Sequence, residues 1–351
     1  MIVESLRASG FRNLSRFEIA LDPGITLIFG KNGQGKTNLL EAAYASISHR
    51  SFRTSDLVSL INENDEYSRL ESNITLAGGR RADLVNVFSR SDRDRVQLNN
   101  RIVKGRKEFD RFPVVAFVPG DVELSRGAPS IRRDFLDGVG AYVTTGYSSL
   151  IASAERLLRQ RQTLIRSSNP DITSLDVFDS RYAEVSEQVA MEREAVVAQL
   201  DPIAGSIHRW LSGGEEKISI CYRRSWEGSC NEQLFKARKE DIRKGTTSYG
   251  CHRDDLALEI DGRPMRSFGS QGQARSFAFS LKLAAANLIE KTLNETPVVI
   301  LDDIFSELDE ERVARLLDGL PKYQILISHT TIPPVGLEMR TLEIRQGVVR
   351  V

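Results

Sequence analysis

The chain has 351 residues, a length that suggests two domains or one large domain carrying an insertion. Its 48 basic residues balance 48 acidic ones, so net charge alone argues neither for nor against a nucleic-acid partner. The composition is that of an ordinary soluble protein, and no apolar run approaches the roughly 18 residues of a membrane span. We therefore expect a cytoplasmic protein without a membrane partner. The three cysteines lack paired spacing, which argues against a zinc site or a disulfide framework.

The first elements follow the pattern of an α/β domain. Val3–Ala8 and Phe17–Leu21 are typical of short strands, and Ile25–Phe29 is an apolar run that ends in glycine, as a buried strand would. Good helix formers then fill Thr37–Ala45. Strand, glycine loop and helix in this order provide the context that a phosphate-binding loop requires.

The glycine loop between this strand and this helix predicts an ATP site. Its glycines let backbone N–H groups approach phosphates, and the following helix adds its positive N-terminus. We expect Lys36 to reach the β and γ phosphates as a catalytic point charge, and the Thr37 hydroxyl to coordinate Mg²⁺. The predicted phosphate loop consists of Gly30, Lys31, Asn32, Gly33, Gln34, Gly35, Lys36 and Thr37.

An alternating stretch from residue 69 to residue 104 predicts antiparallel strands with turns at Gly78–Gly79 and Asn99–Asn100. From Arg80 to Arg111, here called the basic segment, ten basic residues stand against five acidic ones. Such a surface would attract duplex DNA through its phosphates, independently of sequence. An ordinary solvated charged face would explain the same composition.

Helical spacing dominates from Ile131 to Leu211, with Ser167–Pro170 separating two helices. This predicts a helical lobe inserted into the α/β domain. The following segment, Leu211–Glu215, copies an ABC-type signature, but Lys217–Tyr222 alternates like a strand. We therefore interpret Leu211–Glu215 as a turn without a phosphate-binding helix start.

A better signature segment is Phe268–Gln273, which precedes an amphipathic helix. Small and amide side chains at a helix start form an anion site, which would suit a γ-phosphate held by another subunit. An ordinary N-capped core helix is the alternative interpretation.

Two acidic residues follow the apolar run Val298–Leu301. A carboxylate at the end of a parallel strand beside the phosphate loop can hold Mg²⁺, which fits Asp302. Asp303 would act as the catalytic base on the attacking water, although two acids capping the next helix are the alternative. The run Gln324–Ile327 predicts another buried strand, and residues 341–351 predict a closing hairpin that turns at Gln346–Gly347.

These segments, in this order, resemble those of the RecF family, relatives of the SMC-type and ABC-type ATPase heads. Three further segments carry the resemblance across nearly the whole chain: Phe11–Asn13, the stretch Pro119–Asp137, and Gly250–Asp255. Two positions depart from the family pattern. Gly120 stands where an acidic residue is usual, and Cys251 replaces the usual proline. Neither position is an expected phosphate or metal ligand.

The resemblance implies an ATP-binding role for further residues. Arg12 and Asn13 would lie on the nucleotide side of the site, and Ser270 and Gln273 would contact the γ-phosphate bound to the partner's Lys36. His329 stands where ABC-type heads carry a γ-phosphate sensor, with an ordinary loop histidine as the alternative.

The resemblance also implies an activity and partners. ATP binding would close a homodimer on double-stranded DNA beside single-stranded gaps, and a slow, DNA-stimulated hydrolysis would reopen it. Work with RecR, and in many lineages RecO, would load RecA in recombinational repair, replication-fork maintenance and the SOS response.

The expected fold is therefore α/β: a P-loop ABC/SMC-head-like ATPase domain with an antiparallel β subdomain and an inserted helical lobe. We place one discontinuous lobe at residues 1–118 and 275–351, and a mainly helical lobe with the signature segment at residues 119–274. Three alternatives stay open: a transporter nucleotide-binding subunit, a chromosome tether and a metabolic kinase. The first would need a permease, the second longer helical arms, and the third a small-substrate pocket.

Overall fold

The chain folds into two compact units, one that holds both six-stranded sheets and one that is mainly helical. The computed structural model describes residues 1–103, 108–214, 216–307, 311–313, 315, 323–332 and 338–350. We call Met1–Asp121 with Lys282–Val351 the sheet unit, and Val122–Leu281 the helical unit. The sequence-based limits, 118/119 and 274/275, differ by a few residues, and that division of the chain stays a prediction. The second limit falls inside one helix, α8 (Gln271–Leu293), in both cases.

A largely parallel sheet forms the centre of the sheet unit. Its order is β15-β14-β3-β13-β12-β8, and every neighbouring pair is parallel except β14 with β15. The carboxyl ends of β3, β12 and β13 therefore lie at one edge, where α/β sheets bind ligands. The predicted strands and closing hairpin are confirmed as β3 (Ile25–Phe29), β12 (Val298–Leu301), β13 (Ile325–His329), β14 (Arg340–Arg345) and β15 (Val348–Arg350). The edge strand β8 (Val114–Phe117) was not predicted from the sequence.

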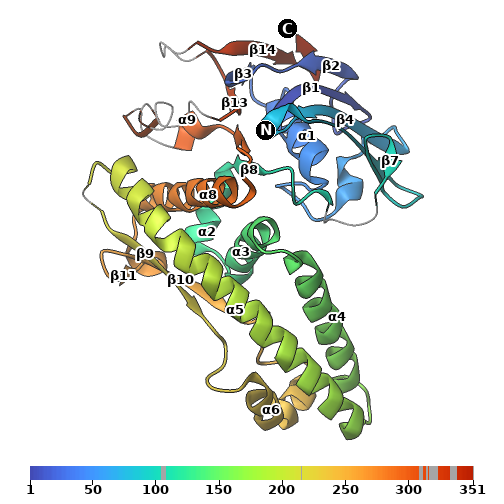
Figure 1. The fold of residues 1–351 in the computed structure, drawn as a ribbon, viewed down its shortest axis with the longest axis vertical. Coiled ribbons are helices and arrows are strands. Elements are labelled where there is room, and N and C mark those ends of the chain that lie inside the picture. Colours follow the sequence, from blue (N-terminus) through green and yellow to red (C-terminus); the bar gives the residue numbers. More distant parts are fainter. Residues whose placement is uncertain are drawn as a thin grey trace. The chain divides into compact units, whose positions relative to one another are not determined.

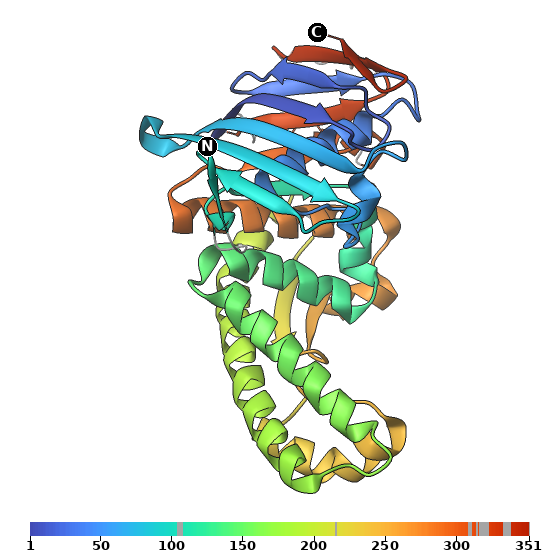
Figure 2. The same cartoon turned by 90° about the vertical axis from the view of Figure 1, so that its right-hand side faces the viewer.

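The second sheet of this unit is antiparallel, in the order β2-β1-β4-β5-β6-β7. Its long strands lie side by side in Figure 2. The turn at Asn99–Asn100 is confirmed, with both residues at positive φ, 50° and 63°, where Asn is better tolerated than most residues. The strands are β1 (Ile2–Ser9), β2 (Phe17–Ala20), β4 (Tyr67–Thr75), β5 (Arg81–Ser89), β6 (Arg95–Leu98) and β7 (Arg101–Ile102).

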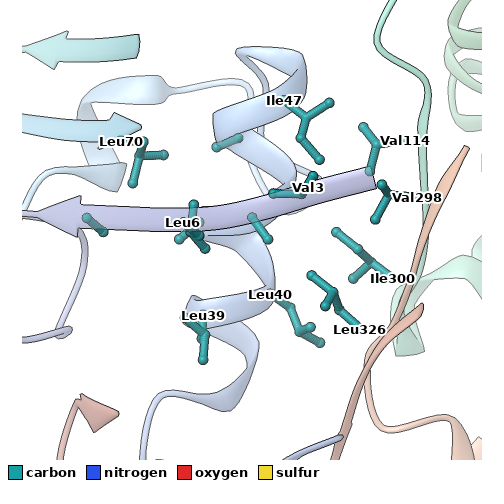
Figure 3. Close-up of a cluster of buried hydrophobic side chains, with 14 of the residues drawn as sticks. Val3, Leu6, Leu39, Leu40, Ile47, Leu70, Val114, Val298, Ile300 and Leu326 are labelled. Carbon is teal, nitrogen blue, oxygen red and sulfur yellow. The ribbon is translucent and has the colours of Figure 1, made fainter. Parts of the chain in front are cut away.

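Helix α1 (Lys36–Ser48) contacts strands of both sheets. Its side chains complete a buried cluster whose burial is the main stabilising term for this unit (Figure 3). The cluster includes Val3, Leu6, Leu39, Leu40, Ile47, Leu70, Val114, Val298, Ile300 and Leu326. The described residues of this unit also include the short helical turns η1 (Leu57–Leu60), η2 (Ala77–Gly79), η4 (Pro119–Asp121) and α9 (Ile304–Glu307).

The helical unit is built around α5 (Ile172–Leu211), a 40-residue helix (Figure 1). The breaker before it is confirmed, because Asp171 accepts the N–H groups of Thr173 and Ser174 and so caps the helix. Helix α4 (Tyr147–Ile165) packs against α5. The other helices are α2 (Val122–Arg126), α3 (Pro129–Val143), α6 (Cys230–Lys244), α7 (Met265–Phe268) and the first part of α8.

Buried charges join three of these helices. Arg161 of α4 is fully buried and donates to Asp179 of α5 at 2.6 Å and to Asp241 of α6 at 2.9 Å. Arg238 adds a second contact to Asp179, at 2.7 Å. Because both acids and Arg161 are withdrawn from water, removing one partner would leave a buried charge uncompensated. These contacts hold α4, α5 and α6 in one arrangement.

The described part of the segment Leu211–Glu215 is a helix end and a turn, as interpreted from the sequence. Helix α5 ends at Leu211, residues 212–214 form a turn, and Glu215 lies outside the described residues. The strand β9 (Ile218–Arg223) follows and pairs with β10 (Asp255–Ile260) in a small sheet that ends with β11 (Arg263–Pro264). No helix start is therefore available at the described part of this segment. In the described residues no helix is long and apolar enough to cross a membrane.

Candidate nucleotide and magnesium site

The phosphate loop joins β3 to α1 at the carboxyl edge of the parallel sheet. Its glycines take positive φ values that other residues rarely adopt: 154° at Gly30, 77° at Gly33 and 112° at Gly35. A Cβ atom on Gly30 would lie 2.3 Å from the carbonyl oxygen of Ile344, so the residue also lacks room for a side chain. Gly35 cannot cap α1 with a side chain, which leaves the helix start open to an anion.

Lys36 curls over the loop that carries it. Its Nζ donates to the carbonyl oxygens of Gly30 at 2.7 Å and of Lys31 at 3.1 Å, and lies 3.4 Å from Oδ1 of Asn32. Burial lowers the pKa of Lys36, an effect that the nearby carboxylates of Asp303 and Asp302 oppose. The ammonium group thus lies within the loop, close enough to both acids for their charges to act on it.

Thr37 and Asp302 meet at this edge. The Thr37 hydroxyl is 2.9 Å from Oδ2 and 3.1 Å from Oδ1 of Asp302. Ser328, at the end of β13, donates to Oδ1 at 2.7 Å. Burial raises the pKa of Asp302, while the two hydroxyl donors lower it. A hydroxyl and a carboxylate that converge beside a phosphate loop form an oxygen donor set that fits Mg²⁺.

Ser328 connects the two acids, and nothing in the sequence indicated that this serine belongs to the site. Its hydroxyl oxygen accepts the backbone N–H of Asp303 at 2.9 Å while its proton goes to Asp302. Asp303 itself has φ 52°, an uncommon value for a residue with a side chain. The tight backbone turn between the two acids therefore gives their carboxylates different surroundings: that of Asp302 is buried and that of Asp303 is half exposed.

His329 is the last residue of β13 and lies next to Asp303. Its Nδ1 is 3.9 Å from Oδ1 of Asp303, and this buried nitrogen has no hydrogen-bond partner in the described part of the chain. Its ring centroid is 4.8 Å from that of Phe305. Three strand ends at one edge of the sheet thus supply the residues predicted from the sequence. Lys36 and Thr37 begin the helix after β3, Asp302 and Asp303 follow β12, and His329 ends β13.

The guanidinium of Arg12 is bound by groups of the protein itself, whereas a residue that contacts phosphate would keep its donors available. Its guanidinium forms a two-pronged bond with the carboxylate of Glu41, at 3.0 and 3.1 Å, and donates to the carbonyl oxygen of Ser59 at 2.8 Å. Glu41 is fully buried on α1 and also accepts from the Ser51 hydroxyl at 2.5 Å. The only sequence signal for this pair was a charged residue on the buried face of a helix. The contact of Arg12 with nucleotide stays a prediction.

Asn13 contacts the start of α1 through side chains. Asn38 donates to Oδ1 of Asn13 at 2.7 Å and accepts from Arg53 at 2.8 Å. Arg53 also lies 3.4 Å from Glu41. These polar contacts tie the Arg12–Asn13 segment to the helix that begins in the phosphate loop.

The C-terminal hairpin braces the same loop. Gln34 accepts the N–H of Gln346 at its side chain, 2.6 Å away, and that of Gly347 at its carbonyl oxygen, 2.9 Å away. A Cβ on Gly347 would lie 2.1 Å from the carbonyl oxygen of Asn13, and the glycine has φ 76°. The turn predicted at Gln346–Gly347 is confirmed, and its close approach to both segments requires glycine.

The signature segment belongs to the helical unit. Its Ser270 and Gln273 form a capping box at the start of α8: Oε1 of Gln273 accepts from the N–H of Ser270 at 2.8 Å, and the Ser270 hydroxyl accepts from the N–H of Gln273 at 3.2 Å. Ser270 and the next two residues are exposed. The N-cap of the alternative interpretation is thus present, and the helix start it builds faces solvent in this chain. Contact of Ser270 and Gln273 with a phosphate stays a prediction.

The basic segment forms strands β5 to β7 and the loops around them. Its seven described arginines are all exposed, and five acids accompany them. Arg95 lies 3.8 Å from Asp92, and Arg111 is paired with Glu108, so part of the charge is neutralised locally. The remaining basic residues, Lys104, Arg106 and Lys107, lie outside the described residues. Contact of this segment with DNA stays a prediction.

Comparison with known proteins identifies the family and the fold. Residues 2–332 match the family model described as the RecF/RecN/SMC N-terminal domain. The DNA replication and repair protein RecF of Agathobacter rectalis is 33% identical over 348 residues, which cover 94% of this chain and 92% of that protein. A solved structure of the recombination mediator protein RecF with ATP, in the RecFOR pathway, superimposes with a TM-score of 0.92 at 27% identity, covering 99% of this chain and 96% of that one. The Smc head domain from Pyrococcus furiosus, at 17% identity and a TM-score of 0.55, shares the fold.

Proposed function

This chain belongs to the RecF family of ATP-binding DNA replication and repair proteins, and from that premise we propose that it is an ATP-driven dimer switch on DNA. ATP would join two copies of the chain on double-stranded DNA beside a single-stranded gap. A slow, DNA-stimulated hydrolysis would separate them. The observation that carries the proposal is the meeting of the Thr37 hydroxyl and the Asp302 carboxylate next to Lys36.

The phosphate loop would bind the nucleotide. Its glycines direct backbone N–H groups toward phosphate, and Arg12 and Asn13 would support the nucleotide side. Lys36 would leave the carbonyl oxygens of Gly30 and Lys31 and place its charge on the β and γ phosphates.

Thr37 and Asp302 would hold Mg²⁺, directly or through water. Bound there, Mg²⁺ would neutralise phosphate charge and polarise the bond that breaks. Asp302 suits this role because its carboxylate is buried and oriented by Thr37 and Ser328. Metal binding requires the ionised carboxylate, so it would offset the effect of burial on the pKa of Asp302.

Asp303 would act as the general base. Its half-exposed carboxylate can reach a water molecule, while its backbone is held by Ser328. His329, whose Nδ1 lies 3.9 Å from this carboxylate, would sense the γ-phosphate side of the site. This division of work between neighbouring acids follows from their different surroundings.

The second half of the site would come from another copy of the chain. Ser270 and Gln273 lie at an exposed helix start, where a capping box orders both side chains and backbone N–H groups can meet an anion. A phosphate loop and such a helix start, brought together across a two-fold axis, would give two composite ATP sites per dimer.

The proposed partners extend this switch into repair. In recombinational repair, replication-fork maintenance and the SOS response, the ATP-bound dimer would work with RecR, and through it RecO, to load RecA at single-stranded gaps. Support comes from the family membership and from a related structure placed in the RecFOR pathway. We expect the protein to act in the cytoplasm.

A second candidate is an ATPase subunit of another ABC-type assembly, a transporter or a chromosome tether. The shared head fold alone allows it, as the likeness to the Smc head shows. ATP-dependent binding to duplex DNA by the purified chain would favour the repair switch. Dependence on a permease, or on a long-armed partner, would favour the alternative.

Sedimentation with and without ATP tests the proposal. We expect the wild type to form dimers with Mg²⁺ and ATP, and Lys36→Met and Ser270→Arg to remain monomeric. Mixing the two variants adds a control, because a dimer of one of each contains one intact composite site. ATP-driven dimers of Ser270→Arg alone would contradict the assignment of the signature segment to the partner's nucleotide.

A further inference from the structure

The side-chain amide of Gln273 is engaged at both ends. Its Oε1 accepts from the Ser270 N–H at 2.8 Å, and its Nε2 donates to Oε1 of Glu216 at 3.2 Å. An amide whose oxygen meets a donor and whose nitrogen meets an acceptor has a fixed orientation. Glu216 stands 57 positions away in the chain, directly after the turn that imitates a signature.

The second carboxylate oxygen of Glu216 contacts a histidine of α5. Its Oε2 lies 2.9 Å from Nε2 of His208, which is fully buried in the last turn of that helix. The other ring nitrogen, Nδ1, lies 3.1 Å from the hydroxyl of Ser280 on α8. The contacts therefore run from the end of α5 through Glu216 to the first turn of α8, all within the helical unit.

Hydrogen bonds connect this histidine to α8 as well as to Glu216. The Ser280 hydroxyl donates to the carbonyl oxygen of Ser276, 2.7 Å away, and its oxygen faces Nδ1 of His208. Nε2 faces a carboxylate oxygen of Glu216. The two ring nitrogens of His208 therefore link the body of α8 to Glu216.

We propose that Glu216 is a positioning residue for the signature amide. By holding one hydrogen of the Gln273 amide, it would orient the second toward the γ-phosphate bound to the partner copy, beside the Ser270 hydroxyl. This inference rests on the proposed function, because it deepens the role given to Ser270 and Gln273. The proposal also gives a role to the segment after Leu211, because this segment connects the end of α5 to Glu216.

The arrangement couples the helical unit to the ATP contact. The last turn of α5 and the first turn of α8 share one chain of charge-assisted bonds, so a shift of α5 would move the Gln273 amide. Binding of a partner or of DNA to the helical unit would reach the composite site through this connection.

Three variants test the positioning role. Glu216→Ala removes both contacts, Glu216→Gln keeps an oxygen for Gln273, and Glu227→Ala changes an exposed glutamate of the same unit as a matched control. We would measure ATP-dependent dimerisation by sedimentation, ATP binding to the monomer, and hydrogen exchange of the α8 start without nucleotide. The last measurement does not require dimerisation.

Glu216→Ala should weaken dimerisation about tenfold for each of the two composite sites, as expected for one lost hydrogen bond to a charged acceptor at each site. It should leave monomer ATP binding unchanged and speed exchange at the α8 start, whereas Glu216→Gln and Glu227→Ala should resemble wild type. Wild-type dimerisation in Glu216→Ala, with Ser270→Arg inactive, would overturn the positioning role and leave the proposed function standing. If the wild type fails to dimerise, the proposed function fails. In that case, unchanged hydrogen exchange at the α8 start of Glu216→Ala would also overturn the contact between Glu216 and Gln273. Faster exchange would support that contact.

Discussion

The Thr37 hydroxyl lies 2.9 and 3.1 Å from the two carboxylate oxygens of Asp302, although 265 positions separate the two residues in the chain. The contact forms because β3 and β12 belong to one parallel sheet, with β13 between them. Parallel strands bring their carboxyl ends to the same edge, where the loop after β3 and the acid after β12 meet. This relationship carries the proposed metal site, and the first prediction follows from it.

Asp302→Asn should keep the local hydrogen bonds and lose the charge that a metal requires. We expect the Mg²⁺ concentration for half-maximal ATP hydrolysis to rise about 10- to 100-fold. A Mg²⁺ titration of the ATPase rate measures this, with Asp92→Asn, an exposed acid of the same unit, as control. A titration curve identical to that of the wild type would remove Asp302 from the metal site.

Asp303→Asn should separate ATP binding from hydrolysis. The amide cannot accept a proton from water, so we expect the hydrolysis rate to fall about 100-fold or more while the ATP affinity stays within about twofold. ATP-bound dimers should then persist during gel filtration after free nucleotide is removed. Hydrolysis at the wild-type rate would reject Asp303 as the base.

Glu41→Gln should destabilise the sheet unit. Glu41 is fully buried and accepts from Arg12 and Ser51, so its loss leaves the Arg12 guanidinium with a weaker partner. Breaking a buried ion pair costs about 3 kcal/mol or more, and we expect a loss of this order in the free energy of unfolding. Urea denaturation measures it, with the exposed Glu63→Gln as control. Equal midpoints for the two variants would show that the pair adds no stability.

His252 should make the stability of the helical unit depend on pH. Burial lowers the pKa of His252 to about 4. Its Nδ1 lies 2.6 Å from the Tyr182 hydroxyl, and its Nε2 lies 3.1 Å from the carbonyl oxygen of Thr247. The unfolded chain, with an ordinary histidine pKa near 6.5, binds a proton first as the pH falls. Stability is therefore complete above about pH 6.5 and is lost progressively down to about pH 4.

The size of this effect follows from the shift in pKa. A difference of about 2.5 units corresponds to about 3 kcal/mol between pH 7 and pH 4. In His252→Gln this part of the pH dependence should vanish, while that of the carboxylates remains. Urea midpoints of both proteins between pH 4 and pH 7 test it, and parallel curves would contradict it.

The DNA prediction concerns the basic segment. Arg93 and Arg101 are exposed, and replacing both with Ala should weaken duplex binding and lower the slope of log affinity against log salt by up to about 2. The exposed Arg243→Ala in the helical unit is the control. Affinities would be measured with and without ATP across a salt series. An unchanged slope would place the DNA surface elsewhere, and absence of any ATP dependence would count against the clamp.

The sequence by itself determined the fold class and predicted the phosphate loop, because both depend on local patterns. Apolar runs, turn residues and helical spacing predicted most strands of the two larger sheets and the long helices, which the structure confirms, but not β8, β10 or α6. The glycines, Lys36 and Thr37 stand within eight consecutive positions, so spacing alone identified them. Asp302 could be predicted from the sequence for a similar reason, because an acid at the end of an apolar strand is a local signal.

Only the tertiary structure decided which side chains support these residues. Ser328 between the two acids, Glu41 beneath Arg12, Gln346–Gly347 against the phosphate loop and Glu216 at Gln273 all act across long stretches of chain. Such partners carry no signal in their own neighbourhood, since a serine at a strand end or a glutamate after a turn is ordinary in itself. Their contacts exist because sheet order and helix packing bring distant residues within hydrogen-bond distance.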